Sequence, residues 1–365
     1  MNPSLYKSLI RPILFRLDSE QAHLLIHRLA GQCRPLLTVA GAAWQYRGDD
    51  LQCDLFGHKL SNPIGLAAGF DKNADLVELL GHVGFGYAEV GSVTALAKEG
   101  NPKPRLFRLP KDRALINRLG LNGAGADRVA AQLERCNFSI PIGLNIAKTN
   151  DPAITGDAAV EDILYTFKKI RDLPLSYVTI NGSCPNTKEG IVTEAAHMRT
   201  LFTQVQKLNT RQLPILVKLS PDSSQDLLQE MVEAASECGL SGYVCGNTST
   251  SRENLATDEA TLKAIGNGGM SGPPLKSKAL RICQIVNQLK NPSQIIIACG
   301  GVSCGADAYE FLVAGASFVQ LYTALVYEGP GLPLMICREL SSILRRNGQT
   351  LEQAIGWKQK SSAIG

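Results

Sequence analysis

Short apolar runs that alternate with longer helical patterns constrain the fold of this chain more than any other feature. The runs, rich in β-branched residues, span residues 63–68, 86–91, 141–146, 176–181, 214–219, 241–246, 294–299 and 317–322. Helical patterns occupy 73–82, 124–135, 158–171, 194–208, 224–238, 275–289, 305–314 and 332–346. Strands that alternate with helices are typical of a parallel sheet, and eight such units predict an α/β fold, a single (β/α)8 TIM barrel.

The N-terminal segment does not fit this repeat. Apolar side chains gather near one helical face of residues 1–17, namely Leu5, Leu9, Ile10, Ile13 and Leu14. A second helix is predicted from Asp18 to about Gln32. We therefore expect a helical hairpin over residues 1–45 ahead of a barrel over residues 46–365. The first helix either lies on a membrane surface or packs on the barrel, and the pattern alone leaves both possibilities open.

The composition narrows the possible partners. The net charge of +4 comes from 37 basic and 33 acidic residues, an excess too small to indicate nucleic acid but suited to a small anionic ligand. No stretch of eighteen apolar residues is present, so we expect no transmembrane helix. The ten cysteines form no CxxC pair, which favours a reducing compartment.

Active sites of such barrels lie at the carboxyl ends of the strands. Gly300 and Gly301 follow the seventh run, and Tyr322 and Thr323 follow the eighth. Glycine lets backbone N–H groups approach an anion, so we predict a phosphate site here, which Gly272 would extend. The connections 92–140 and 247–293 are long enough to be functional loops.

Polar residues at the same rim indicate a bound ring. Lys72 and Lys218 lie within or just after strands, where a buried cation calls for an anionic partner. An asparagine offers both a donor and an acceptor, and five of them lie in loops or at strand ends: Asn117, Asn145, Asn181, Asn186 and Asn247. Cys184 stands in the polar loop NGSCPNT and is a candidate general base.

Several segments together resemble the dihydroorotate dehydrogenase family, specifically its membrane-associated, quinone-reducing class. The matching text includes GLAAGFDKNAD, GFGYAEVGSVT, LINRLGLN, GLNIAKTN, NGSCPNT, VKLSPD, GNTST, GGMSGPPL, ACGGV and GASFVQLYTAL, and it covers about residues 50–325. The N-terminal DSEQAH with its flanking apolar helices also matches that class.

The resemblance implies a non-covalently bound flavin mononucleotide, FMN. Its contacts would be Ala68, Gly69, Phe70, Asp71, Lys72, Ser92, Asn145, Asn181, Lys218, Gly246, Gly272, Gly301, Tyr322 and Thr323. Dihydroorotate, or its product orotate, would be held by Lys72, Asn117, Arg118, Leu119, Gly120, Leu121, Asn181, Asn186, Asn247 and Thr248.

The resemblance also implies the chemistry and the cellular location. Cys184 would remove the C5 proton while a hydride leaves C6 for the flavin. A membrane quinone would enter between the N-terminal helices, with His23, Arg108 and Tyr322 as neighbours. The protein would bind peripherally to the cytoplasmic side of the cell inner membrane.

Three positions depart from the family pattern. Cys184 replaces the serine usual in the quinone class and matches the soluble class, Leu121 replaces a phenylalanine, and Gly246 replaces a threonine. The first departure keeps open a soluble class 1 enzyme that uses fumarate or a nicotinamide-linked partner. Lys72 and Lys218 could instead form a Schiff base, which makes a lysine-dependent aldolase a second alternative. A non-catalytic membrane-surface module is the third.

Overall fold

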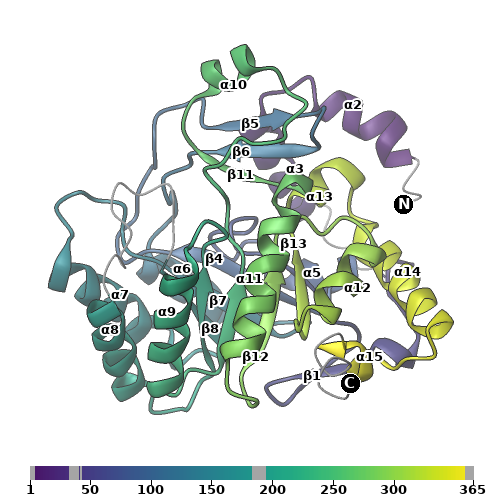
Figure 1. Ribbon diagram of the computed structural model, residues 1–365. Helices are drawn as coiled ribbons and strands as arrows, with labels where there is room; N and C mark the ends of the chain where they lie inside the picture. The colour runs from purple at the N-terminus through teal and green to yellow at the C-terminus, as the bar shows by residue number, and fades with distance from the viewer. Residues whose placement is uncertain (1–4, 33–40, 42, 183–194, 358–365) are drawn as a thin grey trace.

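The fold is a closed barrel of eight parallel strands with helices around it (Figure 1). The computed structural model describes residues 5–32, 41, 43–182 and 195–357. In barrel order the strands are β3 (Ile64–Leu66), β4 (Tyr87–Val93), β7 (Ile142–Ile146), β8 (Tyr177–Asn181), β9 (Ile215–Leu219), β10 (Gly242–Cys245), β12 (Ile295–Cys299) and β13 (Phe318–Leu321). The closing pair is β13 with β3. The predicted TIM barrel is confirmed, and the core strands coincide with the eight apolar runs.

The outer helices follow the predicted pattern closely. They are α5 (Val77–Leu80), continued by the 3-10 turn η3 (Gly81–Val83), then α6 (Ala126–Arg135), α7 (Gly156–Ile170), α8 (Ala195–Leu208), α9 (Gln225–Glu237), α11 (Lys276–Leu289), α12 (Gly305–Val313) and α14 (Leu332–Arg346). The first of them begins later than the predicted residue 73, because a loop occupies 71–76. Three short helices, α10 (Glu259–Ile265), α13 (Thr323–Glu328) and α15 (Leu351–Ala354), were not predicted.

A hairpin closes the end of the barrel opposite the active-site rim. It consists of β1 (Cys53–Leu55) and β2 (His58–Leu60), which follow the 3-10 turn η2 (Asp49–Leu51). Leu55 and Leu60 pack against an apolar interior layer that includes Tyr87 and Tyr177. The interior at this end is therefore filled by side chains, as in other barrels of this type.

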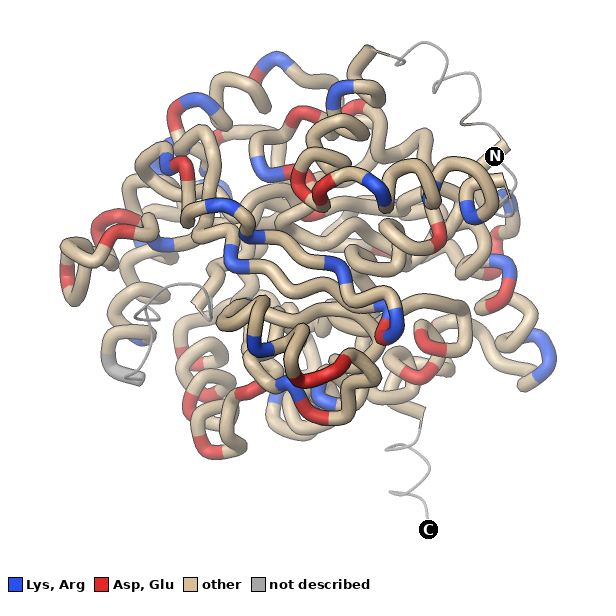
Figure 2. The backbone as a smooth tube through the Cα atoms, turned by 90° about the horizontal axis from the view of Figure 1, so that it is seen from above, with Lys and Arg blue, Asp and Glu red and all other residues tan. Residues whose placement is uncertain are grey.

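The two long connections meet in one small sheet over the opposite end. Strands β5 (Leu106–Leu109) and β6 (Ala114–Asn117) come from the first connection, and β11 (Gly269–Ser271) comes from the second. The central strand β6 pairs antiparallel with both neighbours, and α10 (Glu259–Ile265) and η4 (Pro273–Leu275) flank β11. Figure 2 looks down on this sheet and shows Lys and Arg along its strands.

The N-terminal segment forms η1, a π-helix (Tyr6–Ile10), then α2 (Arg11–Leu14) and α3 (Ser19–Gln32). The carboxylate of Asp18 accepts the backbone N–H groups of Glu20 and Gln21, both at 3.0 Å, which is why α3 begins at this point. In Figure 1 these helices lie beside β5 and α13, near the mouth of the barrel. Among the described residues, no helix is both long and apolar enough to cross a membrane.

Candidate active site

A cavity of about 150 Å³ opens at the carboxyl ends of the barrel strands, and we call it the polar cavity because lysine, asparagine and serine side chains line it among apolar ones. The structure brings most of the predicted site residues to its wall: Ala68, Gly69, Lys72, Ser92, Asn117, Leu119, Gly120, Leu121, Asn181, Lys218, Asn247, Thr248, Gly272, Gly301, Tyr322 and Thr323. These residues come from both ends of the barrel sequence and from the sheet above it. They therefore meet only in the folded chain.

Some predicted residues lie elsewhere. Cys184 and Asn186 fall outside the described residues, so their placement stays a prediction. Asn145 is buried beneath the cavity floor, where its Nδ2 donates to Glu89 at 2.8 Å. Gly246 is also outside the lining. Its φ is +125°, and a Cβ here would lie 1.6 Å from the carbonyl oxygen of Cys299, so only glycine fits.

Arg118 and Phe70 were predicted to contact the ligands, but their side chains point away from the polar cavity. The Arg118 guanidinium donates to the backbone carbonyls of Asn267 and Pro104, at 3.2 and 3.0 Å, and stacks over the ring of Phe107. It therefore joins the two long connections. The ring of Phe70 lines a second, apolar cavity.

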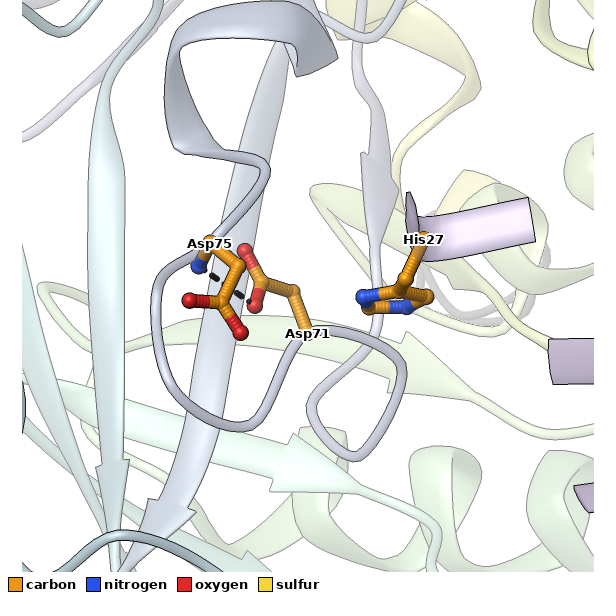
Figure 3. A group of neighbouring side chains, drawn as sticks. All are labelled: His27, Asp71 and Asp75. Atoms are coloured by element: carbon orange, nitrogen blue, oxygen red, sulfur yellow. Dashed lines mark hydrogen bonds between the residues drawn. The ribbon is translucent and has the colours of Figure 1, made fainter. Parts of the chain in front are cut away.

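Asp71 holds a loop and does not line the cavity. Its two carboxylate oxygens accept the backbone N–H groups of Asp75 and Leu76, at 2.9 and 2.8 Å. Burial raises the pKa of Asp71 to about 6 against the opposing effect of these bonds. Figure 3 shows His27 of α3 facing this loop, and ligand atoms of His27, Asp71 and Asp75 lie within 4.8 Å of one another. Since both Asp71 oxygens are already engaged, the group serves to order the segment that carries Lys72.

One end of the cavity is a cradle of glycines. Gly272, Gly300 and Gly301 line it with φ values of +110°, +131° and +79°, a region that favours glycine. Thr323 lies beside them, and its hydroxyl donates to Ser271 at 2.7 Å. A glycine carries no side chain that would keep an anion away from its backbone N–H group, so this end of the cavity suits an anion.

Lys72 supplies a cation whose charge is easily lost. Its ammonium group donates to the side chain of Asn122. Burial, with a smaller contribution from the nearby Arg105 cation, lowers the pKa of Lys72 to about 8 although Glu20 opposes both. An anion bound beside Lys72 would restore the charged form, since opposite charges favour ionisation.

The cavity floor contains a chain of hydrogen-bonded side chains. The Ser92 hydroxyl donates to Asn145, Asn181 Nδ2 donates to Ser92 at 3.0 Å, and Asn247 Nδ2 donates to Asn181 at 3.3 Å. Several further residues line the cavity without having been predicted from the sequence: Asn122, Ser271, Cys299 and Gln320. Cys299 and Gln320 could have been found from the alternation of side chains along β12 and β13. Each lies two positions after an apolar residue that faces the barrel interior, and so faces the same way.

An apolar cavity of about 370 Å³ lies next to the polar one, between the N-terminal helices and the barrel. Its wall includes Ile10, Leu14, Ala22, His23, Ile26, Phe70, Trp44, Arg108, Leu325 and Tyr322. His23, Arg108 and Tyr322, which were predicted as neighbours of a quinone, are thus brought together. Tyr322 also lines the polar cavity, so a single aromatic side chain belongs to both walls.

The polar groups of the apolar cavity are held in defined states. Burial lowers the pKa of His23 to about 3, with His27 and Lys72 adding to the effect, so its imidazole is neutral near pH 7. Burial raises the pKa of Tyr322 to about 12. Arg108 donates to the carbonyl of Leu17 at 2.9 Å and stacks over Phe15. A guanidinium has five N–H donors, so Arg108 can bond Leu17 and still donate to a largely apolar guest.

Comparisons with known proteins agree on one family. A family model described as dihydroorotate dehydrogenase matches residues 50–344. A protein of Roseiflexus sp. (strain RS-1), named dihydroorotate dehydrogenase (quinone), is 40% identical over 97% of this chain and 98% of its own length. A protein of Natronomonas pharaonis with the same name is 39% identical over 95% of this chain and 98% of its own length.

Solved structures show the same similarity in three dimensions. A crystal structure of DHODH from Eimeria tenella in complex with ferulenol superposes with a TM-score of 0.80 at 32% identity. The superposition covers 93% of this chain and 95% of that chain. A ligand-free structure from the same organism gives a TM-score of 0.78 at 31% identity.

Proposed function

The chain belongs to the dihydroorotate dehydrogenase family, and from this premise we propose that it oxidises dihydroorotate to orotate with bound FMN and reduces a quinone. The observation that carries the proposal is the shared wall at Tyr322, which places a polar, anion-binding cavity next to an apolar one. Dihydroorotate is polar and anionic and suits the first cavity, whereas a quinone is largely apolar and suits the second. The quinone-dependent names of the relatives favour this acceptor over fumarate or a nicotinamide-linked partner.

The polar cavity suits a flavin. Gly272, Gly300 and Gly301 line one end of the cavity, where we place the phosphate next to backbone N–H groups, and Lys218 projects a buried amine from the floor. Gln320 presents an unpartnered side-chain oxygen there, the kind of acceptor that a polar ligand requires. When bound, the flavin accepts a hydride from the substrate and supplies two electrons to the quinone.

The protein side chains supply orientation and proton transfer. We assign the substrate carboxylate to Lys72, since a buried ammonium is best paired with an anion. Asn117, Asn181 and Asn247 line the same cavity and match a ring of alternating carbonyl and N–H groups. Cys184 accepts the C5 proton, because a thiolate is a base at moderately alkaline pH.

Anaerobic mixing with dihydroorotate tests the proposal directly. The visible absorption of the oxidised flavin is expected to bleach in a single turnover, and subsequent addition of a quinone is expected to restore it. A yellow protein that stays oxidised with dihydroorotate would contradict the proposed substrate. A colourless protein that still contains the folded barrel would instead point to the aldolase alternative.

A pH profile tests the role of Lys72. Its pKa of about 8 in the ligand-free protein means that the ammonium is present below pH 8 and lost above it. We expect kcat/KM for dihydroorotate to fall by about tenfold per pH unit above that value. The profile of Lys72→Met, measured with the same assay, should lack this alkaline limb. A limb that persists unchanged in the variant would assign it to another group.

The N-terminal helices suit peripheral binding to a membrane, which we propose to be the cytoplasmic face of an inner membrane. Leu9 and Ile13 are 58% and 64% exposed, and the basic Arg16 of the same segment is exposed as well, whereas Lys7 and Arg11 bond Glu328 and the carbonyl of Tyr327. Exposed apolar side chains beside basic ones are typical of helices that lie in the lipid interface. We retain residues 1–45 as the unit that binds the membrane and admits the quinone.

Vesicle sedimentation tests this membrane surface. Burial of a leucine or isoleucine in lipid contributes about 1.5–3 kcal/mol, so we expect Leu9→Glu with Ile13→Glu to lower partitioning by roughly a hundredfold or more. Flavin reduction by dihydroorotate should not change. Leu289→Glu on α11, at a site that is 39% exposed, is the matched control and should bind vesicles normally. Equal binding of all three proteins would exclude the helices as the membrane contact.

A further inference from the structure

The interior of the barrel contains a polar layer of which only Lys218 and Gln320 have been given a role above. The apolar layer at the closed end includes Tyr87, Tyr177, Leu216, Val244, Ile297 and Phe318. Side chains of a strand that are two positions apart face the same way. Two positions further along the same strands lie Glu89, Thr179, Lys218, Gly246, Cys299 and Gln320. Interiors of such barrels are usually filled by branched apolar residues, so a polar layer below the cavity requires an explanation.

Glu89 is the acceptor at the centre of this layer. Its side chain is fully buried, and its two oxygens accept hydrogen bonds from Asn145 Nδ2 at 2.8 Å, Gln320 Nε2 at 2.9 Å, and the hydroxyls of Tyr177 and Thr179 at 3.2 Å each. A carboxylate that receives donors on both oxygens fixes the orientation of any amide bonded to it. Each amide must turn its NH2 group toward Glu89 and its oxygen away.

Gln320 shows the consequence most clearly. It is 1% exposed and lines the polar cavity. Its Nε2 is directed to Glu89, and its Oε1 is buried without a hydrogen-bond partner among the residues that the structure describes. A buried amide oxygen without a partner is costly, since its desolvation is not compensated. Such an atom in a ligand cavity points to a donor on the ligand.

Asn145 links Glu89 to the side chains of the cavity floor. Because its NH2 group faces Glu89, its oxygen accepts the Ser92 hydroxyl. Ser92 then accepts from Asn181, and Asn181 accepts from Asn247 through its side-chain oxygen. An amide that donates through its NH2 group in one direction must turn its oxygen in the other direction, so each bond in this chain fixes the orientation of the next amide. The amides of Asn181 and Asn247 thus take their orientation from a carboxylate that does not reach the cavity.

We propose that Glu89 is a positioning residue. It decides which side-chain amides present an oxygen and which present an NH2 group to the flavin site, and it acts on the flavin mainly through Gln320. Gln320 Oε1 accepts a hydrogen bond from an N–H or O–H group of the flavin. This inference rests on the proposed function, because it requires a flavin in the polar cavity. Glu89 itself touches neither the flavin nor the substrate.

Flavin affinity, measured on apoprotein titrated with FMN, tests the assignment without any turnover. Gln320→Met keeps the side-chain length but removes the acceptor, and we expect a rise in Kd of about three- to tenfold. Glu89→Gln replaces one acceptor oxygen by a donor, so the amide bonded to that oxygen, Gln320 or Asn145, must reorient. We expect this variant to raise the Kd by about tenfold or more.

Two comparisons separate positioning from general damage to the barrel. Thr179→Val removes another donor to Glu89 at a buried site outside the cavity lining, and we expect its Kd to stay within about twofold of the unmodified protein. In a double-mutant cycle, Gln320→Met should change the Kd of Glu89→Gln by less than about twofold, because both act through the same bond.

The outcomes separate this inference from the function on which it rests. Tight FMN binding by Gln320→Met and Glu89→Gln, like that of the unmodified protein, would overturn the inference and leave the flavin site intact. A loss in Thr179→Val as large as that in Gln320→Met would also overturn it. An unmodified protein that binds no FMN would reject the proposed function itself. Should Glu89→Gln fail to fold, the comparison of Gln320→Met with Thr179→Val decides.

Discussion

Replacement of Cys184 by alanine is expected to slow flavin reduction by dihydroorotate by about two to four orders of magnitude, the usual contribution of a general base. The C5 proton then has no thiolate to accept it. FMN affinity and the stability of the barrel should change little, since the loop sequence around Cys184 is polar. Stopped-flow absorbance under anaerobic conditions measures the rate for a single turnover, free of any effect on quinone reduction.

Two further cysteine variants show whether the loss in Cys184→Ala is due to the missing base. Cys184→Ser should retain flavin reduction but need a higher pH, because a hydroxyl loses its proton less readily than a thiol. Cys304→Ala is the control, since this partly exposed cysteine precedes α12 and is absent from both cavity walls. Reduction of Cys184→Ala at the rate of the unmodified protein would show that another group is the base.

A bulkier side chain in the apolar cavity is expected to separate the two half-reactions. Ala22 on α3 is 5% exposed and lines this cavity. We expect Ala22→Phe to raise the apparent KM for a quinone by about tenfold or more, a loss of roughly 1.4 kcal/mol of binding, because the new ring occupies the space that the quinone needs. The rate of flavin reduction by dihydroorotate should stay the same.

Leu24 provides the matched control on the same helix. Its side chain is 55% exposed and lies outside the cavity lining, so Leu24→Phe should leave the kinetics with a water-soluble quinone unchanged. Steady-state assays with such a quinone, together with stopped-flow reduction, give both half-reactions. If Ala22→Phe slows both to the same extent, or slows neither, the apolar cavity is not the quinone site.

Much of the candidate site was predictable because it follows from local rules. Lys218 stands near the end of β9, and Gly301 directly follows Gly300 after β12, so counting strands was enough to bring them to one rim. Phe70 and Arg118 were predicted to contact the ligands, but neither lines the polar cavity. Neighbours in sequence turn to opposite sides of a strand or loop, and the resemblance that named the whole stretches 68–72 and 117–121 did not distinguish those sides.

The sequence by itself determined the barrel, because alternating apolar strands and amphipathic helices are read over a few residues at a time and have one efficient way to bury their apolar faces together. Only the tertiary structure decided how distant segments pair. Strand β6 joins β11 across about 150 residues, and Glu89 of β4 meets Gln320 of β13, although strand β3 stands between the two strands. Such pairings depend on the geometry of closure and on the donors and acceptors that closure leaves unsatisfied, neither of which is encoded in any local pattern.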